Sequence, residues 1–236
     1  MLRNVSSSDP RLSATRHLVQ VCEQHLTLDQ VLDADTQPLV RELVSGTLRH
    51  YYSLTARVDQ HLRKPLRQKD ADIRLLLLVG VYQLLHTRIP SHAAVSETVA
   101  CTAKLKKTWA RGLVNAVLRA VSRTTDANPC AADVVPAQPS ATFDHPDWFI
   151  EHCQRALPEH WHSVLHANNT RAPMSIRINP RKVSPARYQD KLREQGIEAE
   201  PNHPDHPETL TLTTPIPQDT LPGYVCLLYT SDAADE

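Results

Sequence analysis

The sequence predicts an α+β protein: an all-α domain over residues 1–125, followed by a small α+β subdomain over residues 145–225. Three observations predict this organisation. Apolar residues recur at helical spacing throughout the first half and nowhere alternate there with a period of two. Residues 126–144 are rich in proline and small polar residues, which is typical of a semi-rigid linker. Residues 174–179 then alternate apolar and polar side chains, as a half-buried strand does.

The all-α domain is expected to form a helical bundle. Its first helix begins at Asp9-Pro10, an N-cap residue followed by a proline in the first turn. Asp70 can cap a third helix that is apolar nearly all round, and such a helix belongs at the centre of a bundle. The expected segments cover residues 10–26, 36–62, 70–85, 91–104 and 109–121.

The second unit mixes helices and strands. Ser184-Pro185 is a helix start, and Gly196 suits the position just after the end of that helix. Helices are expected over residues 147–156, 159–168 and 184–195, and strands over residues 174–179, 197–200 and 209–213.

Charge is divided unevenly between the two units. The whole chain has 26 Lys and Arg residues against 26 Asp and Glu residues, a formal charge of zero. Residues 1–125 hold 18 basic and 10 acidic side chains, a net charge of +8, whereas residues 126–236 hold 8 and 16, a net charge of −8. A basic helical domain favours a polyanionic partner such as RNA.

The basic side chains gather in two connections between expected helices. If both connections lie at one end of the bundle, they form one patch for phosphate groups. Aromatic residues make up only 5% of the chain, which argues against sequence-specific readout of a single strand by this domain alone. The candidate RNA-binding residues are Arg63, Lys64, Arg67, Lys69, Lys104, Lys106, Lys107 and Arg111.

No catalytic residue and no metal site is expected. His203 and His206 lie in a proline-interrupted loop without a helical face on which ligands could converge. The five cysteines contain no C-x-x-C pair, and Cys130 falls in the linker with no base beside it. The five glycines are never close together, which excludes a glycine-rich phosphate or dinucleotide loop.

The first domain resembles a known RNA-binding domain. Residues 79–90 (VGVYQLLHTRIP), residues 92–99 (HAAVSETV) and residues 112–119 (GLVNAVLR) are similar to the NusB-like helical domain. Such a domain occurs alone in antitermination factors and at the N-terminus of certain rRNA methyltransferases. These three stretches fit both.

The second unit separates the two families. Residues 145–148 (HPDW), 167–169 (ANN) and 173–179 (PMSIRIN) resemble the subdomain before the catalytic core of the 16S rRNA cytosine-C5 methyltransferases. Antitermination factors lack that extension. The chain is therefore identified as similar to the N-terminal half of such a methyltransferase, over residues 8–225.

The resemblance implies a function. Members of the family transfer a methyl group from S-adenosylmethionine to carbon 5 of a cytosine in 16S rRNA, with the catalytic cysteines and the cofactor loop in a C-terminal domain. The chain is expected to be truncated before that domain, to bind 16S rRNA weakly, to bind no cofactor itself and to catalyse nothing. Arg177 and Asn179 match a family motif near the RNA-facing cleft.

The remaining expectations concern residues 226–236, the cellular location and oligomeric state, and two alternative functions. Residues 226–236 do not fit the family and resemble translated adapter sequence, so they are expected to be an artefactual tail. A cytoplasmic monomer is expected, without a membrane association and without specificity for DNA. Two other interpretations remain: a stand-alone NusB-like RNA-binding transcription antitermination or assembly factor, and a helical scaffold that binds only protein.

Overall fold

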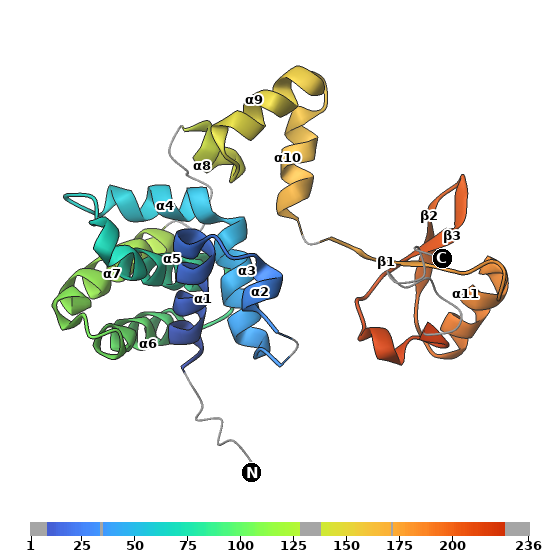
Figure 1. Cartoon of the computed structure of the whole chain (residues 1–236), viewed down its shortest axis with the longest axis horizontal. Helices are drawn as coiled ribbons and strands as arrows, with labels where there is room; N and C mark the ends of the chain where they lie inside the picture. The colour runs from blue at the N-terminus through green and yellow to red at the C-terminus, as the bar shows by residue number, and fades with distance from the viewer. Residues whose placement is uncertain (1–8, 34, 128–137, 171, 225–236) are drawn as a thin grey trace, which may run out of the picture. The chain divides into compact units, whose positions relative to one another are not determined.

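A computed structural model describes residues 9–33, 35–127, 138–170 and 172–224. The chain divides into two compact units, residues 1–169 and residues 170–236. The first unit is helical and the second combines helices with a small sheet (Figure 1), which confirms the predicted fold class. The expected tail at residues 226–236 and most of the expected linker, residues 128–137, lie outside the described residues.

The first unit contains the predicted helical bundle. None of the helices in the described ranges is long and apolar enough to cross a membrane. The elements are α1 (Pro10–Gln24), α2 (Leu28–Val31), α3 (Pro38–Arg49), α4 (Tyr51–Gln60), η1 (Gln68–Asp70), α5 (Ala71–His86), α6 (Ser91–Lys104), η2 (Thr108–Ala110) and α7 (Arg111–Ala127).

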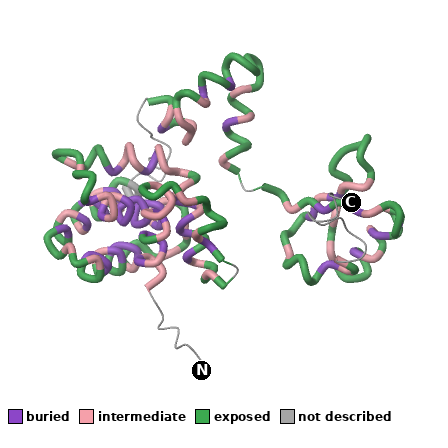
Figure 2. Tube along the Cα trace, viewed as in Figure 1, coloured by how far each residue is buried: buried purple, intermediate pink, exposed green. Residues whose placement is uncertain are grey.

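Helix α5 lies at the centre of this bundle, as its apolar sequence predicts. It packs against α1, α3, α4, α6 and α7, and every residue from Leu75 to Gln83 is buried. Figure 2 shows the buried segments gathered inside the bundle, with exposed residues on the outer turns. A helix surrounded on all sides needs apolar residues on every face.

The segment expected as one helix over residues 36–62 forms two helices instead. The break is at His50, whose backbone leaves the helical region (φ −107°, ψ 26°). The new helix start exposes backbone N–H groups that need acceptors. Asp144 supplies an acceptor for one of these groups, because its Oδ1 accepts a 2.7 Å hydrogen bond from the Ser53 N–H. Its Oδ2 lies 3.1 Å from Nδ1 of His50.

Part of the expected linker is ordered and packs on the bundle. Helix α7 continues to Ala127, and residues Pro139–Phe143 form α8, which contacts α4. The helices α9 (Asp147–Ala156) and α10 (Trp161–Asn169) follow and enclose a small core of Ile150, Cys153 and Leu165. Residues 138–144, which the sequence assigns to the linker, therefore include a helix that contacts α4 and a carboxylate, Asp144, that accepts a hydrogen bond from the first turn of α4.

The second unit is built on a three-stranded antiparallel sheet. Its elements are β1 (Met174–Arg177), α11 (Pro185–Glu194), β2 (Ala199–His203), β3 (His206–Leu212) and η4 (Gln218–Thr220). The strand order is β1-β3-β2, and Met174 pairs with Leu212 at one end of the β1–β3 ladder. Apolar side chains of the sheet and of α11 form one core, with Ile178, Tyr188 and Leu192 fully buried.

Helix α11 has the ends that its sequence predicts. Ser184 Oγ accepts a hydrogen bond from the N–H of Arg187. Gly196 has a positive φ of 72°, and its N–H donates to Arg193 while that of Ile197 donates to Leu192. This pair of bonds is a Schellman motif, in which glycine suits the left-handed position.

The expected loop around His203 and His206 is the tip of a hairpin. The strands β2 and β3 reach these two residues, which pair across the ladder with a register shift between Pro201 and His203. Pro201 lies in β2, an edge strand of the sheet, where a residue without a donor N–H is tolerated. No group of three or more metal-ligating side chains occurs in the part of the chain that the structure describes.

Candidate nucleic-acid interface

The first predicted basic cluster lies in the connection between α4 and α5. Arg63, Lys64, Arg67 and Lys69 are all exposed there. Arg67 Nε lies 4.0 Å from Oδ2 of the buried Asp70, a loose ion pair. The other three side chains face solvent, so their charges are available to an anion.

The second predicted cluster meets the first at Lys107. Nζ of Lys107 donates to the backbone carbonyl of Lys69 at 2.7 Å, to Oδ1 of Asp70 at 3.0 Å and to Oδ1 of Asp72 at 2.6 Å. Partial burial alone would lower the pKa of Lys107, but the hydrogen bonds and charges of Asp72 and Asp70 outweigh it and raise that pKa. Lys107 stays charged, and its charge is neutralised by the two carboxylates.

The other members of the second cluster have different surroundings. Nζ of Lys104 lies 2.9 Å from Oδ2 of Asp9, the N-cap residue of α1. Lys106 and Arg111 are exposed. The structure therefore brings the two connections together, and it uses Lys104 and Lys107 to hold elements of the bundle in place.

A groove between α6 and α7 carries cations that the two clusters did not include. We call it the α6–α7 groove. It has a volume of about 420 Å³, and it is bounded by Ser91, His92, Val95, Ser96, Val99, Arg111, Asn115, Arg119, Ser122 and Arg123. None of these ten residues is acidic, so the groove has a positive potential.

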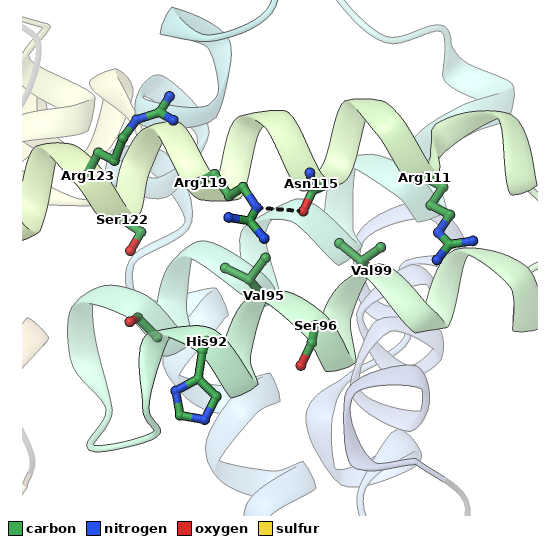
Figure 3. Close-up of a pocket in the computed structure, with 10 residues that line it drawn as sticks. His92, Val95, Ser96, Val99, Arg111, Asn115, Arg119, Ser122 and Arg123 are labelled. Atoms are coloured by element: carbon green, nitrogen blue, oxygen red, sulfur yellow. Dashed lines mark hydrogen bonds between the residues drawn. The ribbon is translucent and has the colours of Figure 1, made fainter.

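The arginines of the α6–α7 groove follow one helix. Arg111, Asn115, Arg119 and Arg123 are spaced four residues apart on α7, which places successive side chains about 6 Å apart along the helix axis. In Figure 3, Arg111 and Arg119 extend from α7 toward α6, with Val95 beneath Arg119. Arg119 Nε donates a 3.0 Å hydrogen bond to Asn115 Oδ1, which fixes the guanidinium on the wall of the groove.

The opposite side of α7 lines a second groove of about 360 Å³. Arg63 and Lys64 form its basic rim, and Leu113 and Val117 of α7 contribute to its apolar wall. Exposed cations therefore lie on both sides of α7. On one side they are arginines of α7 itself, and on the other they are Arg63 and Lys64 of the connection between α4 and α5. This pattern suits a nucleic-acid backbone better than a small anion, which needs one convergent pocket.

His92, Arg119 and Arg123 are not among the binding residues that the sequence predicts. A signal was present, because Arg111, Asn115 and Arg119 recur at i, i+4 and i+8 within the helix expected over residues 109–121, and Arg123 continues this spacing just beyond it. A count of basic residues in the loops misses these residues, because they lie along a helix and become neighbours only when that helix forms.

The two candidates in the second unit lie near the end of β1. Arg177 is exposed, with Nη2 3.8 Å from Oε1 of Glu208. Asn179 follows the strand, and its Oδ1 accepts a 3.1 Å hydrogen bond from the N–H of Arg181. Asn179 therefore organises the turn toward α11, whereas the side chain of Arg177 is 63% exposed beside Glu208.

The glycines of the described residues are not adjacent, so they do not form a glycine-rich loop of the kind that cradles a phosphate or a dinucleotide. Gly46 and Gly80 instead lie where helices pack closely, against Tyr82 and Leu118. Gly112 lies in α7, and Gly196 ends α11.

Two family models match the chain. Residues 4–123 match the NusB family. Residues 145–219 match the RsmF/B-like methyltransferase ferredoxin-like domain. The two matches follow each other along the chain, one over the helical bundle and one from the start of α9 to η4.

Several curated proteins are similar over most of this chain. The probable ribosomal RNA small subunit methyltransferase B of Coxiella burnetii is 38% identical over 223 residues, which are 92% of this chain and 50% of that protein. Ribosomal RNA small subunit methyltransferase B of Pseudomonas putida is 40% identical over 198 residues, 81% of this chain and 45% of that protein. The chain thus spans about half the length of the curated relatives it matches.

A solved structure has a similar fold. The crystal structure of PH0851 superposes with a TM-score of 0.57 at 15% sequence identity, covering 93% of this chain and 52% of that one. Because the sequence identity is only 15%, this similarity shows a shared fold alone.

Proposed function

Because the chain belongs to the NusB family through residues 4–123, we propose that it is the RNA-binding portion of a methyltransferase acting on 16S rRNA. The reaction proposed for the whole protein is transfer of a methyl group from S-adenosylmethionine to carbon 5 of a cytosine. The match of residues 145–219 to the RsmF/B-like domain supports this class. So do relatives that are named ribosomal RNA small subunit methyltransferase B.

The α6–α7 groove is the observation that supports RNA binding by these residues. Arg111, Arg119 and Arg123 contribute three guanidinium groups along one helix, and no acidic side chain lines the groove. Guanidinium groups bind phosphate oxygens in a bidentate manner. Exposed Arg63, Lys64 and Lys69 extend the basic surface beyond the groove.

The second candidate is the stand-alone antitermination or assembly factor. It accounts for the helical bundle equally well. It leaves the second unit, with its own core around Ile178, Tyr188 and Leu192, without a role. The methyltransferase interpretation accounts for both units.

The experiment is a salt titration of RNA binding. The complete chain is incubated with 16S rRNA transcribed in vitro, and the Kd is measured by filter binding at several KCl concentrations. Replacing three phosphate-binding cations by the triple substitution Arg111→Gln, Arg119→Gln and Arg123→Gln should weaken binding. It should also reduce the slope of log K against log [KCl] by about 2–3.

The matched control is Arg155→Gln on α9. Arg155 is an exposed arginine that lies outside both grooves and bonds to Glu151 one turn earlier in the same helix. This variant should bind 16S rRNA as the unmodified chain does. Equal affinity and slope for the triple variant and the unmodified chain would contradict the proposed interface.

The remaining parts of the proposal are tested with the same protein. Duplex DNA of the same length should bind more weakly than 16S rRNA at equal salt. The 236 residues alone should transfer no methyl group from S-adenosylmethionine to 16S rRNA. Methylation of 16S rRNA by this chain would overturn the proposal that the chemistry belongs to residues outside it.

A further inference from the structure

Trp109 is the most unusual residue of the basic surface, because it is 57% exposed. Large aromatic side chains normally bury most of their surface. Trp161, in contrast, packs edge-on against Phe143, with ring centroids 5.2 Å apart. Among the described residues, no ring contact involves Trp109, so both faces of its indole are free of aromatic neighbours.

The backbone that carries Trp109 is held firmly. Trp109 lies in η2, between Lys107 and Ala110. Lys107 is bound through its three hydrogen bonds to Lys69, Asp70 and Asp72, and Ala110 is fully buried. An exposed side chain on a fixed backbone loses little conformational freedom when a ligand binds, which favours affinity.

Lys106, three residues earlier, adopts a conformation that lysine normally avoids. Its φ is 58°, at the position after α6 where helices usually place glycine. The surrounding Schellman motif is complete, since the N–H of Lys106 donates to Ala103 and that of Lys107 donates to Thr102. A lysine there is disfavoured relative to glycine, because its Cβ crowds the neighbouring carbonyl oxygen in this conformation. An exposed ammonium retained at that cost suggests a function for it.

The surroundings of Trp109 are cationic. Lys106 and Arg111 flank it in sequence, Arg111 begins the α6–α7 groove, and residues 104–112 contain no acidic side chain. Trp148 is the opposite case. It is 69% exposed, but it lies between Asp147 and Glu151 on α9. An aromatic platform between cations suits an anionic ligand with a flat ring system.

We infer that the connection between α6 and α7 binds an unpaired nucleotide of RNA, whose base stacks on Trp109 while Lys106 and Arg111 contact the neighbouring phosphates. This inference rests on the proposed function and deepens it, because it assigns a single-stranded element to the RNA ligand. One stacking platform accepts any base. It therefore gives a preference for unpaired RNA without sequence-specific readout.

The test compares two tryptophans in the complete chain. The probes are an unstructured 12-nucleotide RNA and a blunt 12-base-pair RNA duplex, each carrying a fluorescent label for anisotropy. Trp109→Ala should weaken binding of the single strand about 10-fold or more, because it removes one stacked base. It should change duplex binding by less than about twofold and leave the salt slope unaltered, since no charge is lost.

Trp148→Ala is the matched control, because it removes an indole of similar exposure from an acidic surrounding. It should bind both RNAs as the unmodified chain does. Intrinsic fluorescence gives a second readout. The single strand should quench tryptophan emission in the unmodified chain and in Trp148→Phe, and this quenching should be lost in Trp109→Phe.

Each outcome decides a different claim. If Trp109→Ala binds the single strand as tightly as the unmodified chain, or if quenching persists in Trp109→Phe, the stacking site is wrong. The proposed function would still stand if the arginine variant lost affinity for 16S rRNA. If the unmodified chain binds neither short RNA, the stacking site is wrong, and the proposed function is wrong as well only if the chain also fails to bind 16S rRNA. A selective loss of single-strand binding in Trp109→Ala supports the inference.

Discussion

Lys104 Nζ lies 2.9 Å from Asp9 Oδ2, and this ion pair joins the end of α6 to the start of α1. Asp9 is also the N-cap of α1, with Oδ1 accepting the N–H of Arg11 at 3.0 Å. Burial alone would raise the pKa of Asp9. The hydrogen bond from Lys104, the N–H of Arg11 and the charge of Lys104 outweigh burial, so the pKa lies below its usual value of 3.8.

The first prediction concerns acid stability and the substitution Asp9→Asn. Asparagine caps a helix as well as aspartate does, so the substitution removes the charge and keeps the cap. A carboxylate whose pKa is lower in the folded state stabilises the protein above its unfolded pKa and loses that contribution as the pH falls through the folded pKa. The native chain should therefore exceed Asp9→Asn in free energy of unfolding at pH 7.

The measurement is urea unfolding at a series of pH values from 7 to about 2.5. The difference between the two proteins should be constant down to about pH 4 and then decrease toward zero. A difference near zero at pH 7 would show that Asp9 contributes through its cap alone, and a difference that stays the same across this range would show that the ionisation of Asp9 does not cause it.

The bundle was largely predictable from sequence because its signals are local. The Asp9-Pro10 start and the apolar centre from Leu75 to Gln83 each depend on residues within one or two helical turns. The same holds in the second unit for Gly196, which ends α11. The break at His50 was not predictable. Its cause is Asp144, which is 94 residues away in sequence and lay in a stretch with the composition of a linker.

The candidate interface was predictable only in part, for the same reason. Lys107 belongs to a basic cluster in the sequence, yet Asp70 and Asp72 of another segment neutralise it. Arg119 and Arg123 were overlooked because their significance depends on α6 lying beside α7. Composition identifies charges, but only tertiary contacts determine which charges remain available.

The second prediction concerns Asp144, which caps α4 from outside the helix. Asp144→Ala removes the acceptor for the Ser53 N–H. Ser53 is only 8% exposed. Loss of an N-cap costs about 0.5–2 kcal/mol. Amide hydrogen exchange in the first turn of α4 should therefore accelerate, by about 10-fold for a cost of about 1.4 kcal/mol.

Asp144→Asn is the informative comparison. The backbone at Asp144 is left-handed, with φ of 53°, and asparagine tolerates this conformation while alanine does not. The difference in exchange between Asp144→Asn and the native chain should thus be small, because an amide oxygen can still accept from Ser53. Exchange in α11 of the second unit should be unaltered in both variants. Equal protection of α4 in Asp144→Ala and the native chain would contradict the role of Asp144 as a cap.

The third prediction concerns Gln83, a fully buried amide in α5. Its Oε1 accepts a 2.9 Å hydrogen bond from Arg11 Nε, and its Nε2 donates to Val79 O at 3.0 Å and to Thr98 Oγ1 at 3.3 Å. Gln83→Met keeps the volume and leaves Arg11 without its acceptor. The free energy of unfolding should decrease by about 1–3 kcal/mol in urea titrations.

A double-mutant cycle separates this network from packing. Arg11→Met combined with Gln83→Met removes both partners, so neither is left unpaired. The double variant should lose less stability than the sum of the two single variants. Additive losses would show that Arg11 and Gln83 do not depend on each other.

The fourth prediction compares two helical glycines with opposite surroundings. A methyl group at Gly46 would overlap the ring of Tyr82. That ring cannot easily move, because Tyr82 is 4% exposed and its hydroxyl donates a 2.6 Å hydrogen bond to Glu42. Around Gly112 in α7, no atom beyond its chain neighbours and the backbone of its own helix lies within 4 Å of an added methyl group.

Alanine has the higher helix propensity at both positions, by about 1 kcal/mol, so the two substitutions separate propensity from packing. Gly112→Ala should raise the free energy of unfolding by up to about 1 kcal/mol, measured by urea unfolding. Gly46→Ala should lower it, because overpacking costs about 1–3 kcal/mol and outweighs the gain in propensity. Stabilisation by Gly46→Ala would mean that α3 and α5 can separate without cost, and the close packing of Gly46 on Tyr82 would then have no energetic importance.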